Sequence, residues 1–492
     1  MALQALSGSF LPGGAADAPS GYNKEAKRGE SVQRLSSYSI LSIRLKKGGY
    51  ALLNGLSGAM DIVNEDLYNI LYERQNSEGC QKVYFDDGFF PNELQEQFIR
   101  RGHLTTFSHE DEKEKLAATA DDLHKRSRMN PKFTIIPDTD CNYRCGYCFE
   151  KHLQCKSGES TVMDINKVDS VYRAIEEISG GTNTDGQCIS LYGGEPLNAK
   201  NKDVVFRIVE TGQSKGYCFD ATTNGHDLDA FLPLMGKGGI EEVQVTLDGS
   251  RHIHDKRRVA LDKSSSYDRV TANLCKLAKE TDTKIHVRIN ADKENADGLT
   301  ELFADLEEKG LLGSPQIGYY VTPVFGKDAE PFGNADVEDA LAKLKISFPD
   351  IHVASSQSYD GHMIFRDLLD STPYRLKSVY CGAAANVYIF MPDGSIASCM
   401  EVLGKEHNII GHYSDEGVTL DREKHNLWMN RSAAKIPQCL DCKYCLICGG
   451  GCPQNAMNRH GNLYTPDCDD FKETYPAILA DAAERYLTAN NV

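Results

Sequence analysis

The chain has 492 residues, so at roughly 150 residues per domain it holds about three domains, and a small stapled scaffold is excluded. Acidic residues outnumber basic ones by 71 to 54, and the formal charge of -17 argues against a nucleic-acid partner. No apolar run reaches the ~18 residues that span a bilayer, and no export signal opens the chain. We therefore expect a cytoplasmic protein without a membrane partner.

The first segments differ sharply in composition. Residues 1–36 are rich in Gly, Ala, Ser and Pro and predict a flexible tail. Residues 37–105 contain two strand-like runs and then two helical stretches, the first opening at Asn64 and the second ending at Gly102. Residues 106–131 are highly charged, which predicts a solvated linker helix.

Residues 132–326 alternate strand-like and helical stretches, which predicts a parallel sheet. The expected strands lie at 132–140, 188–195, 217–225, 242–249, 284–292 and 316–324. Six such units make an open or partial barrel, whose chemistry gathers at the C-terminal ends of the strands. Residues 327–380 predict a helical connection, and residues 381–492 a cysteine-rich domain dominated by loops.

The sixteen cysteines are clustered, with three within 141–148 and eight within 381–468. In a chain without an export signal, clustered cysteines ligate metal more often than they form disulfides. Cys141, Cys145 and Cys148 follow the first strand with C-x3-C-x2-C spacing. Three thiolates on one loop can hold three corners of an iron-sulfur cube and leave one iron open. The alternative is a zinc site completed by His152 or Cys155.

This motif resembles that of the radical S-adenosylmethionine (SAM) superfamily, which implies a partial (β/α)6 TIM barrel. In that family SAM binds the open iron, an electron from the cluster cleaves SAM, and a 5'-deoxyadenosyl radical abstracts hydrogen. Tyr147 matches the aromatic residue before the last cysteine and is expected near the adenine. Gly193, Gly194, Glu195 and Pro196 resemble the GGEP stretch that holds the methionine amino group.

Further residues that match the family lie at later strand ends. The third and fourth strands end where the ribose and carboxylate of SAM would lie, and the fifth ends at a residue without an assigned role. Arg258 resembles a basic position of the family, with an exposed loop arginine as the alternative. The strand-end residues are Thr223 and Asn224, Thr246 and Asp248, and Asn290.

The C-terminal cysteines resemble the seven-cysteine SPASM domain, which carries two auxiliary iron-sulfur clusters. The resemblance implies that auxiliary cluster I is held by Cys381, Cys399 and Cys452. It implies that auxiliary cluster II is held by Cys439, Cys442, Cys448 and Cys468. A pair of zinc knuckles is the alternative.

Two features depart from the SPASM pattern. No cysteine lies between Gly382 and Ser398, so auxiliary cluster I is expected to have an open iron that can bind a substrate thiolate. Cys445 is an extra thiol that serves as an alternative ligand, a catalytic group or an inert residue. Glu401 lies near the place of an acidic proton acceptor in some members, although a surface glutamate is the simpler interpretation.

Residues 37–105 resemble a PqqD-like winged-helix module, which binds the leader of a precursor peptide along a sheet edge. The resemblances together imply an enzyme with three 4Fe-4S clusters, SAM and an external electron donor such as flavodoxin or ferredoxin. We expect it to form thioether crosslinks from substrate cysteines in a ribosomally synthesised peptide. The alternatives are carbon-carbon crosslinking, formylglycine formation as in anaerobic sulfatase-maturating enzymes, and a non-enzymatic iron-sulfur or zinc protein.

Overall fold

A computed structural model describes residues 33–77, 84–86, 89–153, 161–181, 186–324, 332–355, 358–468 and 470–490. Residues 1–32 of the predicted flexible tail lie outside the described residues. The predicted boundary of the tail at residue 36 is wrong, because Gln33–Leu35 forms strand β1. The chain divides into two compact units. We call Asn130–Ser356 with Asn386–Trp428 the barrel unit, and Met1–Met129, Gln357–Ala385 and Met429–Val492 the cysteine-rich unit.

The barrel unit is built on one large sheet in the order β13-β12-β11-β10-β9-β8-β7-β14-β15-β16-β17. All six predicted strands are present and pair in parallel, in chain order. They are β7 (Lys132–Ile135), β8 (Cys188–Leu191), β9 (Cys218–Thr223), β10 (Ile240–Thr246), β11 (Lys284–Ala291) and β12 (Ile317–Pro323). The predicted partial barrel of parallel strands is therefore confirmed.

Five further strands extend this sheet at both sides. β13 (Val353–Ser355) adds to β12 and lies within the segment predicted as a helical connection. β14 (Val387–Phe390) pairs in parallel with β7. An antiparallel meander of β15 (Ser395–Ala397), β16 (Ile409–Ser414) and β17 (Gly417–Leu420) continues from it. The expectation of a loop-dominated region after residue 381 is wrong here, because these strands complete their hydrogen bonds on the barrel sheet.

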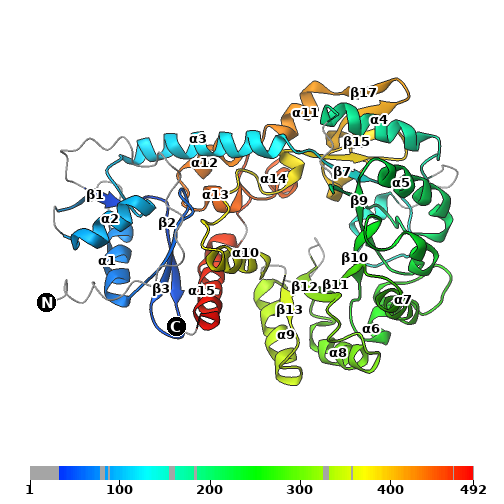
Figure 1. Ribbon diagram of the computed structural model, residues 1–492, viewed down its shortest axis with the longest axis horizontal. Coiled ribbons are helices and arrows are strands. Elements are labelled where there is room, and N and C mark those ends of the chain that lie inside the picture. Colours follow the sequence, from blue (N-terminus) through cyan, green and yellow to red (C-terminus); the bar gives the residue numbers. More distant parts are fainter. Residues whose placement is uncertain are drawn as a thin grey trace. The chain divides into compact units, whose positions relative to one another are not determined.

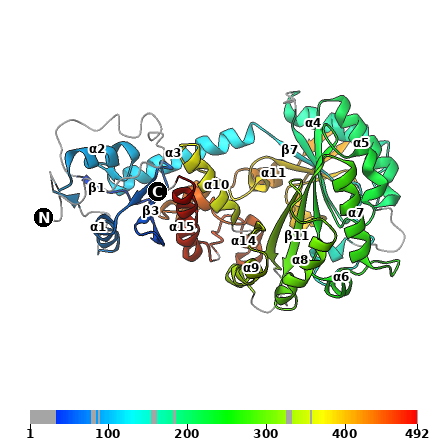
Figure 2. The ribbon, with the colours of Figure 1, turned by 60° about the horizontal axis from the view of Figure 1, so that its bottom comes forward.

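Helices follow the strands, and α4, α5 and α7 lie on the same side of the sheet (Figure 2). α4 buries Val168, Val171 and Ile175, which recur at helical spacing, and it ends at Gly180 in the left-handed conformation. The α-helices of the barrel unit are α4 (Lys167–Ser179), α5 (Lys202–Ser214), α6 (Arg251–Arg257), α7 (Ser266–Glu280), α8 (Leu299–Glu308), α9 (Asn334–Ser347) and α11 (Arg422–Met429). Short 3-10 turns are η3 (Phe149–His152), η4 (Ala199–Asn201), η5 (Leu228–Leu234), η6 (Ala296–Gly298), η8 (Met400–Val402) and η9 (Glu406–Asn408).

A disulfide joins Cys188 and Cys218, the first residues of β8 and β9, whose Cα atoms lie 4.3 Å apart. These residues are direct partners in the register of the two parallel strands. They lie at the strand ends opposite to the Cys141–Cys148 loop, which follows the C-terminal end of β7. Sequence reasoning missed this bond because thirty residues separate the two cysteines.

The cysteine-rich unit begins with a module of small antiparallel sheets in the orders β2-β3-β4 and β5-β1-β6 (Figure 1). Its strands are β1 (Gln33–Leu35), β2 (Ser39–Arg44), β3 (Tyr50–Asn54), β4 (Met60–Val63), β5 (Tyr84–Phe85) and β6 (Leu104–Thr105). α1 (Glu65–Asn76) is capped by the Asn64 side chain, and α2 (Asn92–Arg101) ends at Gly102, as predicted.

The remaining helices of this unit come from three parts of the chain. They are α3 (His109–Arg128), α10 (Ser358–Leu369), α12 (Pro437–Leu440), α13 (Cys445–Cys448), α14 (Pro453–His460) and α15 (Phe471–Ala489), with the short turns η7 (Gly382–Ala384) and η10 (Ala433–Lys435). α3 is the predicted linker helix, but it is not fully solvated. Its Leu116 and Ala120 are buried against Ala433 and Ile436, because the two apolar side chains lie on one helical face.

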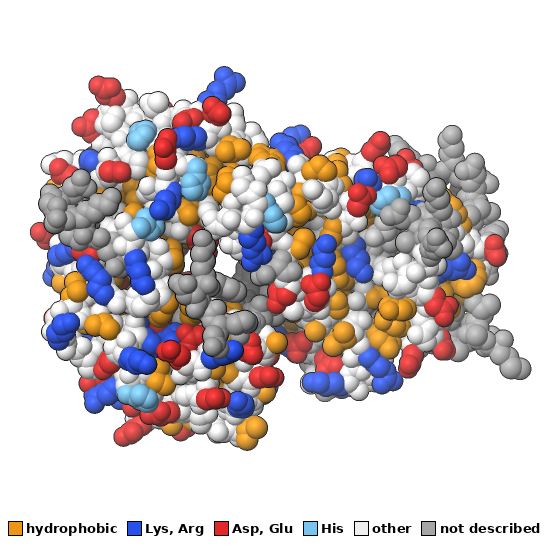
Figure 3. Space-filling view, turned by 180° about the vertical axis from the view of Figure 1, so that it is seen from behind, with side chains coloured by type: hydrophobic (Ala, Val, Ile, Leu, Met, Phe, Trp, Pro, Cys, Tyr) orange, Lys and Arg blue, Asp and Glu red, His pale blue; other side chains and the backbone are white. Residues whose placement is uncertain are grey.

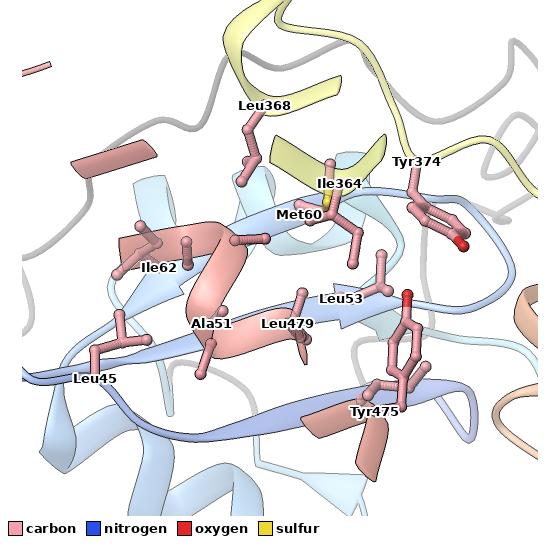
Figure 4. Close-up of a cluster of buried hydrophobic side chains, with 14 of the residues drawn as sticks. Leu45, Ala51, Leu53, Met60, Ile62, Ile364, Leu368, Tyr374, Tyr475 and Leu479 are labelled. Atoms are coloured by element: carbon pink, nitrogen blue, oxygen red, sulfur yellow. The ribbon is translucent and has the colours of Figure 1, made fainter. Parts of the chain in front are cut away.

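The C-terminal helix α15 and α10 cover one face of the β2-β3-β4 sheet (Figure 4). Leu53 and Met60 from the sheet meet Ile364 from α10 and Leu479 from α15, and all four side chains are at most 5% exposed. Residues near both ends of the chain therefore share one hydrophobic core, and the N-terminal module is packed into the cysteine-rich unit.

The surface carries both signs of charge, and acidic and basic side chains are interspersed on the face shown in Figure 3. No helix in the described part of the chain has the length and apolar character that a bilayer crossing requires.

Candidate active site

The Cys141–Cys148 loop leaves the barrel sheet after β7 and is fixed by a second segment, residues 257–261. Arg144 N–H donates to the Val259 carbonyl at 2.8 Å, and Leu261 N–H donates to the Asn142 carbonyl at 2.9 Å. The fully buried Tyr143 and Ala260 form a small apolar cluster on which the three cysteines and Tyr147 pack. The backbone that carries the thiols is thus held in place by the protein itself.

Tyr147 lies at the centre of a buried polar network formed by residues distant in sequence. Its hydroxyl donates to the Asp248 carboxylate. It accepts from Arg258 Nη1 at 2.6 Å and from Asn290 Nδ2 at 3.3 Å. Burial raises the pKa of Tyr147, so the hydroxyl stays protonated. The interpretation of Arg258 as an exposed loop arginine is wrong, because only 8% of this residue is exposed.

Glu195 of the GGEP stretch links the second and third strand ends. Its Oε1 accepts from Thr223 Oγ1 at 2.6 Å and from Leu197 N–H at 2.9 Å, and its Oε2 accepts from Asn224 N–H at 2.6 Å. Burial raises the pKa of Glu195 to about 7. The Asn224 side chain in turn donates to Asn142 Oδ1 at 2.6 Å and lies 3.6 Å from Cys141 Sγ. The Glu195 side chain therefore holds the backbone of Asn224, whose side-chain amide faces the cysteine loop.

The two glycines before Glu195 allow a close approach of backbone to backbone. A Cβ on Gly193 would lie 2.6 Å from the Asp138 carbonyl, and one on Gly194 would lie 2.3 Å from the Asp140 carbonyl. Gly194 N–H and Glu195 N–H donate to these same carbonyls, at 3.1 and 3.0 Å. The GGEP stretch is thus bonded directly to the residues that lead into Cys141. Pro196 and Thr246 are also buried in this unit.

Glu150 is a site residue that sequence reasoning missed. It follows Cys148 by two positions, is 6% exposed, and its Oε1 has no hydrogen-bond partner among the described residues. Burial raises its pKa to about 7, and repulsion from Glu195 adds to the effect. The one sequence signal for Glu150 is its position two residues after the C-x3-C-x2-C motif. Glu401, which was predicted as a proton acceptor or a surface residue, is exposed in η8.

The spacing of the thiols bears on the zinc alternative. Within the described residues, the one set of three Cys, His, Asp or Glu ligand atoms within 4.8 Å of one another belongs to Cys188, Cys218 and Glu241. The Cys141, Cys145 and Cys148 thiols are therefore more widely spaced. Sulfurs bound to one zinc at about 2.3 Å lie only about 3.8 Å apart, whereas a four-iron cube places each thiolate on a different iron. Three thiolates on one loop are the donor type that such a cube takes.

Of the two residues suggested to complete a zinc site, the structure describes His152. His152 Nε2 lies 2.9 Å from the Leu403 carbonyl and Nδ1 lies 3.2 Å from the Phe149 carbonyl, and the single N–H of the neutral ring donates to one of these two carbonyls. Cys155 lies outside the described residues.

The C-terminal cysteines gather around a second site in the cysteine-rich unit. A cavity of about 50 Å³ is lined by all four residues expected to hold auxiliary cluster II and by the extra thiol. These residues are Cys439, Cys442, Cys448, Cys468 and Cys445. Burial raises the pKa of Cys439 to about 12 and also raises that of Cys445, so neutral thiols are favoured there in the absence of a metal.

The residues expected for auxiliary cluster I are divided between the two units. Cys381 and Cys452 belong to the cysteine-rich unit, and both act electrostatically on the buried Arg431. Cys399 belongs to the barrel unit, where its N–H donates to Asn408 Oδ1 at 2.8 Å.

Comparison with known proteins shows which families and folds the chain is similar to. Residues 135–306 match the model of the Radical SAM superfamily. The Cysteine-type anaerobic sulfatase-maturating enzyme of Clostridium novyi (strain NT) is 22% identical over 363 residues, which cover 68% of this chain and 92% of that enzyme. The solved structure of native anSMEcpe with bound AdoMet superposes with a TM-score of 0.54 at 16% identity, covering 74% of this chain and all of that one.

Two other solved structures are also similar. anSMEcpe with bound AdoMet and the Kp18Cys peptide has a TM-score of 0.52 at 15% identity and covers 73% of this chain and 99% of that one. SuiB of Streptococcus suis has a TM-score of 0.47 at 17% identity and covers 88% and 99% of the two chains.

The parallel sheet, the three-cysteine loop and the matched domain make this a radical SAM fold. Residues 135–306 of the chain belong to the Radical SAM superfamily, whose members bind a 4Fe-4S cluster and SAM.

Proposed function

We propose that this chain is a maturase that uses SAM to form a thioether between a cysteine of a ribosomally synthesised peptide and a carbon of an acceptor residue. The observation that carries the proposal is the Cys141–Cys148 loop. It carries three thiolates, the donor type that a four-iron cube takes, and it is fixed against strand ends in the domain that matches the Radical SAM superfamily.

The chain's own residues would hold and orient the cofactors. Cys141, Cys145 and Cys148 would ligate three irons, and the remaining position would take the amino and carboxylate groups of SAM. When bound, this cluster would supply the electron that cleaves SAM, and the auxiliary clusters would take up the electron left after the sulfur-carbon bond forms. The Asn224 amide reaches the cysteine loop, and the Tyr147 hydroxyl with Arg258 forms a buried polar wall beside it.

The thioether is favoured over other linkages by the predicted auxiliary cluster I. Three cysteines are assigned to it, and residues 382–398 contain none, so a substrate thiolate can complete the fourth position. In the balanced reaction the cysteine S–H and one acceptor C–H are lost and a C–S bond forms. One hydrogen atom is abstracted from carbon, and the thiol releases a proton and the second electron.

The product distinguishes the candidate reactions. Reduced, iron-reconstituted enzyme is mixed with SAM and a cysteine-bearing precursor peptide, and the product is analysed by mass spectrometry and thiol alkylation. We expect 5'-deoxyadenosine, a product lighter by two hydrogens and one fewer alkylatable thiol. The same mass loss with an unchanged thiol count would contradict the thioether and indicate a carbon-carbon bond.

Formylglycine formation is the second candidate, because the relative from Clostridium novyi is a cysteine-type sulfatase-maturating enzyme and aligns over 92% of its length. In the same experiment, that reaction would replace the cysteine sulfur with an aldehyde oxygen. A carbonyl-reactive hydrazide would then label the product, whereas a thioether product would stay unlabelled.

Leader binding by the N-terminal module is best tested by point substitutions. Deleting residues 1–105 would remove the sheet that α10 and α15 cover, so the loss of activity would not report on binding. Ile43 on β2 and Tyr72 on α1 are exposed apolar side chains of the module, at 54% and 49%. We expect Ile43→Asp with Tyr72→Ala to weaken binding of a labelled leader peptide at least tenfold. Ile346→Asp, at an exposed position of α9, is the control expected to leave binding unchanged.

A further inference from the structure

Arg431 is a fully buried guanidinium without a carboxylate partner. Its exposure is 0%, and within the described residues no carboxylate oxygen lies within ion-pair distance of it. Arginine remains charged in proteins, and an isolated buried charge is strongly unfavourable unless an anion or several hydrogen bonds compensate it. The rest of the site must therefore supply what stabilises this cation.

Part of the compensation comes from backbone carbonyls on the loops that carry the auxiliary cysteines. Arg431 Nη2 donates to the Gly450 carbonyl at 2.9 Å and lies 3.4 Å from the Thr465 carbonyl, and Nε donates to the Leu463 carbonyl. Gly450 lies between Cys448 and Cys452, and Thr465 lies three residues before Cys468. One side chain thus ties together two loops that carry three of the expected ligands.

The third nitrogen, Nη1, has no hydrogen-bond partner among the described residues. Two other buried donors close by, the hydroxyls of Ser432 and Ser378, are also without partners there. Ser432 adjoins Arg431, and the Ser378 carbonyl accepts from Ala433 N–H at 2.8 Å, so the three residues lie on neighbouring stretches of backbone. Unpartnered buried donors of this kind point to acceptors that the polypeptide itself does not provide.

Cysteines of both auxiliary sets act electrostatically on Arg431. Burial lowers its pKa, and Cys439, Cys381, Cys452 and Cys448 counteract this effect as thiolates. Neutral thiols would supply no negative charge, but cluster-bound thiolates and sulfides supply both charge and hydrogen-bond acceptors.

We propose that Arg431 is the internal countercharge of the auxiliary iron-sulfur clusters and makes them easier to reduce. The inference rests on the proposed function, because it requires the auxiliary clusters. Reduction adds one negative charge to a cluster, and a fixed buried cation stabilises the reduced state more than the oxidised one. Arg431 is thus a positioning and tuning residue for the step in which these clusters take up an electron.

The test compares Arg431→Gln, which removes the charge, with Arg431→Lys, which keeps it. Both variants and the wild type are reconstituted as full chains, their iron is counted, and the auxiliary clusters are titrated against a reductant with detection by electron paramagnetic resonance. For Arg431→Gln we expect at least a tenfold decrease in the equilibrium constant for reduction, a shift of about 59 mV to lower potential. Arg431→Lys should recover at least half of this shift.

Lys472 offers a matched control, because it faces the same cavity but is exposed to solvent. Its charge is screened by water, so Lys472→Gln should shift the potential much less than Arg431→Gln. An equal shift for both, or none for Arg431→Gln, would overturn the proposal. The same holds if Arg431→Lys behaves like Arg431→Gln, since hydrogen-bond geometry and not charge would then be decisive.

Iron content separates the remaining outcomes. If Arg431→Gln loses the auxiliary iron and Arg431→Lys retains it, the countercharge role is supported; if both lose it, Arg431 acts as a structural anchor and the proposal is wrong. A wild type with about four irons per chain would refute the auxiliary clusters, and with them the proposed function. About twelve irons with an unmoved potential would refute only the role of Arg431.

Discussion

The two cysteine sites are held in different ways. The first is a single short loop, and strand ends and the 257–261 segment fix its backbone. The second collects thiols from two short helices and a later loop around one cavity, with a buried cation beside it. A site on one loop needs only local spacing and a rigid support, whereas a site assembled from separate segments needs packing and charge to bring its ligands together.

The largest expected effect is at the single-loop site. Cys145→Ala should abolish 5'-deoxyadenosine formation, because two thiolates do not hold the cluster that binds SAM. Iron should decrease from about twelve to about eight per chain, since the auxiliary ligands are unchanged. Unchanged iron and SAM cleavage would contradict the assignment of this loop.

A smaller effect is expected where the support of the loop is disturbed. Gly194→Ala places a Cβ 2.3 Å from the Asp140 carbonyl, so the GGEP stretch must move away from the cysteine loop at a cost of about 1–3 kcal/mol. Thermal unfolding and SAM titration should show lower stability and weaker binding. Gly146→Ala, inside the loop but with no atom within 4 Å of its new Cβ, is the matched control. Equal effects for both would mean that the close approach does not hold the loop.

The polar wall beside the loop can be tested by removing one hydroxyl. Tyr147→Phe deletes the group that accepts from Arg258 and Asn290 and leaves the buried charge of Arg258 with fewer partners. Hydrogen bonds to charged groups contribute about 1.5–3 kcal/mol, so the dissociation constant of SAM should rise roughly tenfold. Tyr72→Phe, at an exposed position, should leave it unchanged. Unaltered binding in Tyr147→Phe would show that this network does not contribute to SAM recognition.

The smallest effect is expected for Cys445, the extra thiol at the site of the C-terminal cysteines. Cys445 is fully buried and packs in a core cluster with Tyr38 and Leu446. Cys445→Ala should cost about 1 kcal/mol of stability and leave the iron content at about twelve per chain. Cys442→Ala is the comparison and should lose iron. Loss of iron in Cys445→Ala would instead make Cys445 a ligand.

The sequence predicts the parallel strands well, because each is a short apolar run between helices, and the observed strands lie within or close to the predicted ranges. It does not predict β14, which returns from a distant part of the chain to pair with β7. Such a pairing leaves no local periodic signal. The same reason explains the missed Cys188–Cys218 bond, which depends on the register of two strands.

The candidate site also combines features that the local sequence predicts with features that only the fold shows. The spacing of Cys141, Cys145 and Cys148 can be read directly from the sequence, because one loop carries all three. Glu150 and Arg431 could not be recognised, since an isolated charged residue in a sequence is usually exposed. Only the fold shows that both are buried and that each has an atom without a hydrogen-bond partner among the described residues.

The shared core of β3, α10 and α15 has a consequence for engineering this protein. Grafting residues 37–105 alone onto a new host would expose Leu53 and Met60 to water, and truncating the chain before Phe471 would expose the same face of the sheet by removing α15. A transferable form of the N-terminal module must therefore include the sheet, α10 and α15, which come from three separate stretches of the chain. Chimeras of this protein should have their crossover points outside these three stretches.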